Sequence, residues 1–98
     1  MTKFKLDILK FDDIASKIKA LAHPMRVAIV SLLESETKLN VTEISHKIKI
    51  AQTTTSHHLN ILKNKGLLIS KREGKETFYS LKSESLAKII ECIMKCTG

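Results

Sequence analysis

The stretch VTEISHKIKIAQTTTSHHLNILKNKGLLISKREGKETFYSL, residues Val41 to Leu81, decides the fold of this chain. Its apolar residues recur first at the three-and-four spacing of helices and then within short β-branched and aromatic runs typical of strands. The order predicts a helix-turn-helix followed by a hairpin, or wing. The expected bounds are Thr42–Ile48 for the first helix, Lys49–Ala51 for the turn, Gln52–Lys65 for the second helix, and Leu67–Arg72 and Thr77–Leu81 for strands around a tip at Glu73–Lys75.

Local signals support these bounds. Asn40 stands three residues before Glu43, a spacing that is typical of a capping box at a helix start. Gly66 follows the second helix, where glycine is a good terminator because it adopts the left-handed conformation without cost. The two helices of the motif should therefore begin and end close to the predicted residues.

Amphipathic helices are predicted on both sides of this stretch. Pro24 suits the first turn of a nearly all-apolar central helix, in which either Val27, Val30 and Leu33 or Ile29 and Leu32 face inward. The other two helices are Phe4–Leu21, with an apolar face of Phe11, Ile14, Ala15, Ile18 and Leu21, and Glu84–Lys95. The predicted fold is mainly α with a small β-hairpin, a winged helix-turn-helix in one domain over residues 1–98. Its N- and C-terminal helices would form a dimer interface, since a chain of this length buries a modest core.

The charge is concentrated on the predicted motif. The chain carries a net charge of +7, and the window from Lys47 to Lys75 holds seven Lys and Arg residues against one acid, which gives it +6. Such a basic surface suits a polyanion, although a basic face can also be merely solvated. No apolar run approaches the ~20 residues needed to cross a bilayer, so no membrane association is expected and the cytoplasm is the expected location.

The second helix of the motif has a polar, acid-free outer face. Successive residues of a helix are 100° apart around its axis. If Leu59 faces the core, Thr55 and Leu62 face inward as well, and Ile61 is the one apolar residue on the outer face. Small hydrogen-bonding side chains can contact base edges and phosphates in a major groove. The predicted DNA-binding residues of this helix are Gln52, Thr53, Thr54, Ser56, His57 and Asn60. His58 is interpreted instead as a structural histidine.

The wing adds Lys71, Arg72 and Lys75 around its tip. These cations can follow a phosphate backbone or enter a minor groove. They can equally keep an exposed edge strand from pairing with other chains. Both roles remain open at this point.

Three segments resemble the ArsR/SmtB family of bacterial winged-helix repressors: Ala20–Val30, Gln52–Leu59 with Leu62 and Gly66-Leu67, and Arg72–Lys75 with Phe78–Leu81. The resemblance covers about residues 14 to 82. It implies a homodimer, held by the first and last helices, that binds a palindromic operator and is released by an inducer. The chain departs from the family pattern at Ala51, where a serine cap is common, and at Lys49 and Ile50, where glycine is common.

The metal sites of that family are not predicted in this chain. The run Lys38–Glu43 has no cysteine where many members carry thiolate ligands, and Ser83 and Ser85 stand at the ligand positions of the last helix. Cys92 and Cys96 lie four residues apart on the predicted last helix, so they share a face. Buried apolar residues, redox-sensing thiols and soft-metal ligands remain open interpretations of this pair.

These observations predict a sequence-specific DNA-binding transcriptional regulator, a dimeric repressor with double-stranded operator DNA as its partner and an unknown inducer. No paired carboxylates, glycine-rich phosphate loop or nucleophile–base set points to an enzyme, and no cofactor is expected. The alternative is a winged-helix module for protein interaction that does not read an operator.

Overall fold

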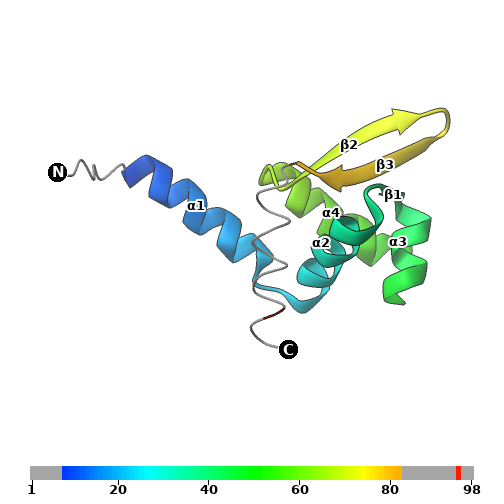
Figure 1. Cartoon of the computed structure of the whole chain (residues 1–98), viewed down its shortest axis with the longest axis horizontal. Coiled ribbons are helices and arrows are strands. Elements are labelled where there is room, and N and C mark those ends of the chain that lie inside the picture. Colours follow the sequence, from blue (N-terminus) through cyan, green and yellow to red (C-terminus); the bar gives the residue numbers. More distant parts are fainter. Residues whose placement is uncertain (1–7, 83–94, 96–98) are drawn as a thin grey trace.

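The computed structural model describes residues 8–82 and residue 95 (Figure 1). The elements are α1 (Ile8–Leu21), α2 (Pro24–Glu36), β1 (Leu39–Asn40), α3 (Val41–Ile48), α4 (Gln52–Asn64), β2 (Leu68–Glu73) and β3 (Glu76–Leu81). The helix predicted over Glu84–Lys95 lies outside the described residues, apart from Lys95, which is helical. Residues 4–7 of the first predicted helix are also outside them.

Helix α2 supplies the centre of the core. Ile29, Val30 and Leu33 are its buried residues, so the inward face combines members of both predicted sets. Pro24 occupies the first turn, and the Nδ1 atom of His23 accepts a hydrogen bond from the backbone N–H of Met25, 3.1 Å away. An imidazole therefore serves as the N-cap of this helix.

The helix-turn-helix has the predicted bounds to within one residue. Asn40 and Glu43 form the predicted capping box at the start of α3. Helix α4 ends at Asn64, and Gly66 has a φ of 78°, a left-handed conformation that glycine adopts without strain. Leu59 and Leu62 of α4 are fully buried, as predicted. The prediction for Ile61 was wrong, because this side chain is partly buried and packs against the core.

The hairpin is part of a three-stranded antiparallel sheet in the order β1-β3-β2. Leu39 pairs with Tyr79 and Asn40 with Phe78, which adds the short strand β1 to the predicted hairpin. Glu73 belongs to β2 rather than to the tip, so the tip is Gly74-Lys75. The hairpin is anchored at its base by buried Leu68 and Tyr79, and its far end extends beyond the helices (Figure 1).

Helix α1 extends away from α2, α3 and α4 on the side opposite to the wing tip (Figure 1). Its predicted apolar face is largely open to solvent in the single chain: Phe11, Ile14 and Ile18 are 40%, 43% and 62% exposed. The Nζ atom of Lys65, just after α4, lies 2.7 Å from Oγ of Ser16 in α1. Three large apolar side chains on one helix face form a surface that a second chain could cover.

Candidate nucleic-acid interface

The outer face of α4 has the composition that the sequence predicted. Five of the six predicted residues on this helix are exposed and Ser56 is half-buried; the exposed ones are Gln52, Thr53, Thr54, His57 and Asn60. There is no acid in the helix. Because α4 is fixed by its buried face, these donors and acceptors are presented to solvent as one surface.

The inward polar residues of α4 have structural partners. Thr55 is fully buried, and its hydroxyl donates to the backbone carbonyl of Ala51, 3.0 Å away. His58 is only 5% exposed, as expected for a structural histidine. Two of the polar residues between Gln52 and Asn60 thus hold the helix, while their neighbours on the other face remain open.

The start of α4 is not capped by a side chain. Ala51 occupies the N-cap position in extended conformation and makes no side-chain hydrogen bond there. The N–H groups in the first turn of a helix have no partner within the helix, and they lie at the positive end of its dipole. This end of α4 can therefore accept an anion such as a DNA phosphate.

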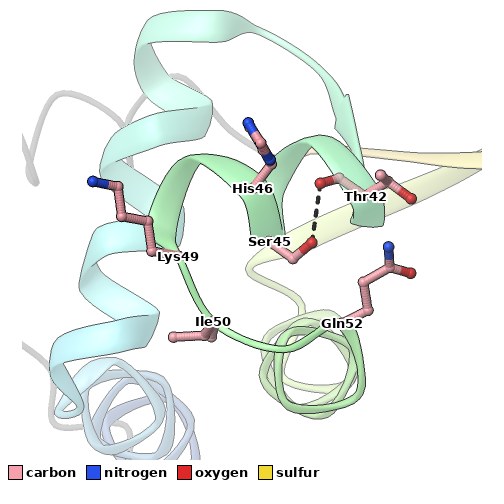
Figure 2. Close-up of a pocket in the computed structure, with 6 residues that line it drawn as sticks. All are labelled: Thr42, Ser45, His46, Lys49, Ile50 and Gln52. Carbon is pink, nitrogen blue, oxygen red and sulfur yellow. Dashed lines mark hydrogen bonds between the residues drawn. The ribbon is translucent and has the colours of Figure 1, made fainter.

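A hollow of about 410 Å³ lies beside that helix start, between α3 and α4. Figure 2 shows the side chains around it: His46 and Lys49 from α3 and its end, Gln52 from α4, and Thr42 at the start of α3. All four are exposed. The other two lining residues are buried Ser45 and half-buried Ile50. The lining contains donors and a cation but no acid, a combination that suits a phosphate.

Lys49 has an unusual backbone at this hollow. It ends α3 in the left-handed conformation, with φ 59° and ψ 47°. That conformation costs a non-glycine residue roughly 1–2 kcal/mol. A non-glycine residue at this position therefore has a conformational cost, and Lys49 contributes an exposed cation to the lining of the hollow.

The wing cations are exposed but do not form one cluster. Lys71 and Arg72 are consecutive on β2, so they leave opposite faces of the hairpin. The Nε atom of Arg72 donates to the carbonyl of Gly74 at 3.2 Å, while Lys75 lies in the tip itself. The three cations thus surround the wing tip, an arrangement that suits contacts with a phosphate backbone.

Arg26 joins α4 to the body of the fold. Its Nε donates to Nδ1 of His58 at 3.2 Å, and its Nη1 donates to the carbonyl of Ala20 at 3.1 Å. The ring of His58 also lies against that of His23, with centroids 4.6 Å apart. Since His58 is adjacent to His57, contacts from α1 and α2 fix the helix segment that presents the predicted DNA-binding histidine.

Thr42, His46 and Lys49 are interface candidates that the sequence argument missed. Two signals were present: glycine is common at Lys49 or Ile50 in the family that the sequence resembles, and Lys47 and Lys49 already belonged to the basic window. The missing information was spatial, because only the fold brings α3 beside the start of α4.

The family model of the bacterial regulatory protein ArsR family matches residues 23–70, from the cap of α2 to the start of the wing. The transcriptional repressor PagR of Bacillus anthracis is 36% identical over 89 residues, which are 91% of this chain and 89% of PagR. This chain belongs to the ArsR family. A regulatory family agrees with the prediction that the protein is not an enzyme.

Other similar proteins and solved structures support this assignment. The cadmium resistance regulatory protein CadC homolog of Staphylococcus aureus is 36% identical over 93% of this chain and 77% of its own length. The crystal structure of PagR matches with a TM-score of 0.81 over 89% of this chain and 99% of that one. A homodimeric winged helix-turn-helix DNA-binding domain from Mycobacterium bovis, 28% identical, matches with a TM-score of 0.84 over 98% and 90% of the two chains. The predicted fold class is confirmed.

The described part of the chain contains no group of three or more His, Cys, Asp or Glu side chains that could hold a metal ion. Cys92 and Cys96, the candidate redox thiols, lie outside the described residues. Within residues 8–82 and residue 95, no helix is long and apolar enough to cross a membrane.

The environment of His58 predicts a pH-dependent stability. Burial lowers the pKa of His58, and the nearby charges of His23, Arg26 and His57 lower it further. The unfolded chain then binds a proton at His58 at higher pH than the folded chain does, near the ordinary value of about 6.5. The free energy of unfolding should therefore decrease as the pH falls from 6.5 to the lowered pKa.

His58→Gln tests this expectation, because a glutamine oxygen can accept from Arg26 but does not titrate. Urea unfolding at pH 7.5 and 5.5 should show a larger loss of stability in the wild type than in His58→Gln. Equal losses in the two proteins would contradict the assignment.

Proposed function

We propose that this protein is a homodimeric transcriptional repressor that binds a palindromic operator through α4, the hollow beside it and the wing. The whole chain would act as one winged-helix unit in the cytoplasm. The observation that carries the proposal is the exposed face of α4, which offers hydrogen-bonding side chains without an acid. Such a face suits base edges in the major groove.

Phosphate contacts would fix the register of α4 in that groove. The hollow lined by His46, Lys49 and Gln52 adjoins the uncapped start of the helix. A phosphate held there would orient the helix without reading sequence. Lys71, Arg72 and Lys75 would contact the backbone or minor groove at the side of the wing.

A second copy of the chain is the expected partner of α1. The exposed face of Phe11, Ile14 and Ile18 resembles half of an apolar interface. The matching domain from Mycobacterium bovis is described as homodimeric, and PagR is named a repressor. A two-fold dimer would place its recognition helices about one DNA turn, roughly 34 Å, apart, which requires a palindromic site.

The role of His57 can be tested with operator DNA selected from a random duplex pool by the wild-type protein. His57→Ala should weaken binding of the selected duplex by about 1–3 kcal/mol if the imidazole contacts a base edge. Binding of a scrambled duplex should change little. Fluorescence anisotropy gives both affinities, and Asn64→Ala, an exposed neutral change at the far end of α4, is the control. Unchanged affinity for the selected duplex would exclude His57 from base recognition.

Lys49→Gly separates stability from DNA binding. Glycine relieves the left-handed backbone, so the free energy of unfolding should rise by up to about 1 kcal/mol. Loss of the ammonium should lower the affinity for the selected and the scrambled duplex by the same factor. It should also reduce the slope of log affinity against log salt concentration by about 1. Thermal melts and anisotropy titrations at several salt concentrations measure the two effects. An unchanged salt slope would remove Lys49 from the proposed phosphate site.

Ile18→Gln tests the dimer. Ile18 is 62% exposed in the single chain, and burying an isoleucine side chain contributes about 1.5–3 kcal/mol. Because the change occurs on both subunits of a symmetric interface, the dimer dissociation constant should rise at least about tenfold. Sedimentation equilibrium measures it, with exposed Lys19→Gln on the same helix as control. Equal dissociation constants for the wild type and Ile18→Gln would contradict an interface at this face.

A further inference from the structure

The wing tip contains two carboxylates that face each other. Glu73 and Glu76 are directly opposite across β2 and β3, next to the Gly74-Lys75 tip. Like charges at opposed positions of an antiparallel pair are destabilising. Two acids would also be repelled by a DNA backbone close to Lys71, Arg72 and Lys75. The hairpin therefore needs partners for both groups on the protein side.

Lys38, which precedes β1, is the partner of Glu73. Its Nζ lies 2.7 Å from Oε2 of Glu73 and 4.9 Å from the ring centroid of Phe78, so the ammonium contacts both strands of the wing. The hydrogen bond from Lys38 lowers the pKa of Glu73. The carboxylate is thus held in its charged form against the segment that leads into α3.

Asn40 is the partner of Glu76, and it has a second role. Its Oδ1 accepts from the N–H of Glu43 at 2.8 Å, which caps α3. Its Nδ2 donates to Oε1 of Glu76 in the wing. One amide side chain therefore connects the start of α3 to the start of β3.

The contact between Asn40 and Glu76 lies at the edge of a hollow. A hollow of about 290 Å³ lies between the start of α3 and the wing, and Asn40, Thr42, Lys75 and Glu76 are among its lining residues. Side-chain packing therefore does not fill this part of the junction. The base of the wing is buried at Leu68 and Tyr79, whereas its far half is exposed or half-buried. The Lys38 and Asn40 contacts act on that far half.

We propose that Lys38 and Asn40 are positioning residues of the wing, which hold its tip at a fixed angle to α3 and α4 so that wing and recognition helix engage one DNA duplex together. The inference rests on the proposed function and adds residues that need not touch DNA. Holding a flexible element in its bound conformation raises affinity because less order must be created on binding.

Two variants break these contacts without changing the net charge. Asn40→Ser keeps a hydroxyl that can cap α3 but is too short to reach Glu76. The double substitution Lys38→Met with Glu73→Gln removes the ion pair away from the cap. Glu76→Gln is the matched control, because its amide oxygen can still accept from Asn40 while one negative charge is lost.

Anisotropy titrations would compare a duplex selected by the wild type with a scrambled duplex of the same composition. Isolated surface contacts contribute little, so each charge-neutral variant should lose about three- to fivefold in affinity for the selected duplex. The scrambled duplex should be bound within about twofold of wild type, because the charge is unchanged. Glu76→Gln should keep the wild-type ratio between the two duplexes or bind both slightly more tightly.

The inference is overturned if both charge-neutral variants bind the selected and the scrambled duplex as tightly as the wild type does. It is also overturned if they lose the same factor of affinity for both duplexes. Melting temperatures close to wild type for the Lys38–Glu73 double variant distinguish a positioning effect from unfolding. If the wild type itself shows no preference for the selected duplex, the proposed function fails as well, which separates that result from failure of the wing inference alone.

Discussion

The candidate nucleic-acid interface depends on the guanidinium of Arg26. This group hydrogen-bonds the carbonyl of Ala20, where α1 ends, and the Nδ1 of His58 in α4. A neutral, accepting imidazole is required at the second contact, which is consistent with the lowered pKa of His58. The rotation of α4 about its axis is thereby fixed by polar geometry as well as by Leu59 and Leu62. Only with that rotation fixed does His57 face away from the protein.

Two residues beside the outer face of α4 are unfavourable for local folding. Ala51 gives α4 no side-chain cap, and Lys49 adopts a left-handed backbone. Serine and glycine would satisfy the local preferences of a cap and a turn. Departures from local preference concentrate where function sets the residue; Lys49 lines the hollow between α3 and α4, and Ala51 is next in sequence to two other lining residues, Ile50 and Gln52. The uncapped start of α4 and the exposed cation of Lys49 are each unfavourable or neutral for folding, but both suit an anion.

The sequence predicted the helix-turn-helix well because its boundaries have local causes. The capping box of Asn40 and Glu43 and the glycine at Gly66 act over three or four residues, and the burial of Leu59 follows from helical spacing. Strand β1 was not predictable in this way, since two residues are too few to show alternation and their extended conformation depends on pairing with β3. Ile61 was misplaced for a similar reason: neighbouring elements widen the buried face of α4 beyond what one helix alone implies.

The residues of the candidate site also fall into two groups, those that local sequence predicts and those that depend on tertiary contacts. Residues of the outer face of α4 could be predicted from one helix, because angle along a helix needs no tertiary information. His46, Lys49 and the Lys38–Glu73 pair depend on contacts between segments up to 35 residues apart, so only the fold reveals them. Asn40 illustrates why this matters. Its Oδ1 contact with Glu43 is local and was predicted, whereas its Nδ2 contact with Glu76 is distant. A cap alone would accept serine or aspartate equally well, but aspartate has no donor for the Glu76 carboxylate and serine is too short to reach it, so only the amide of Asn40 makes both contacts.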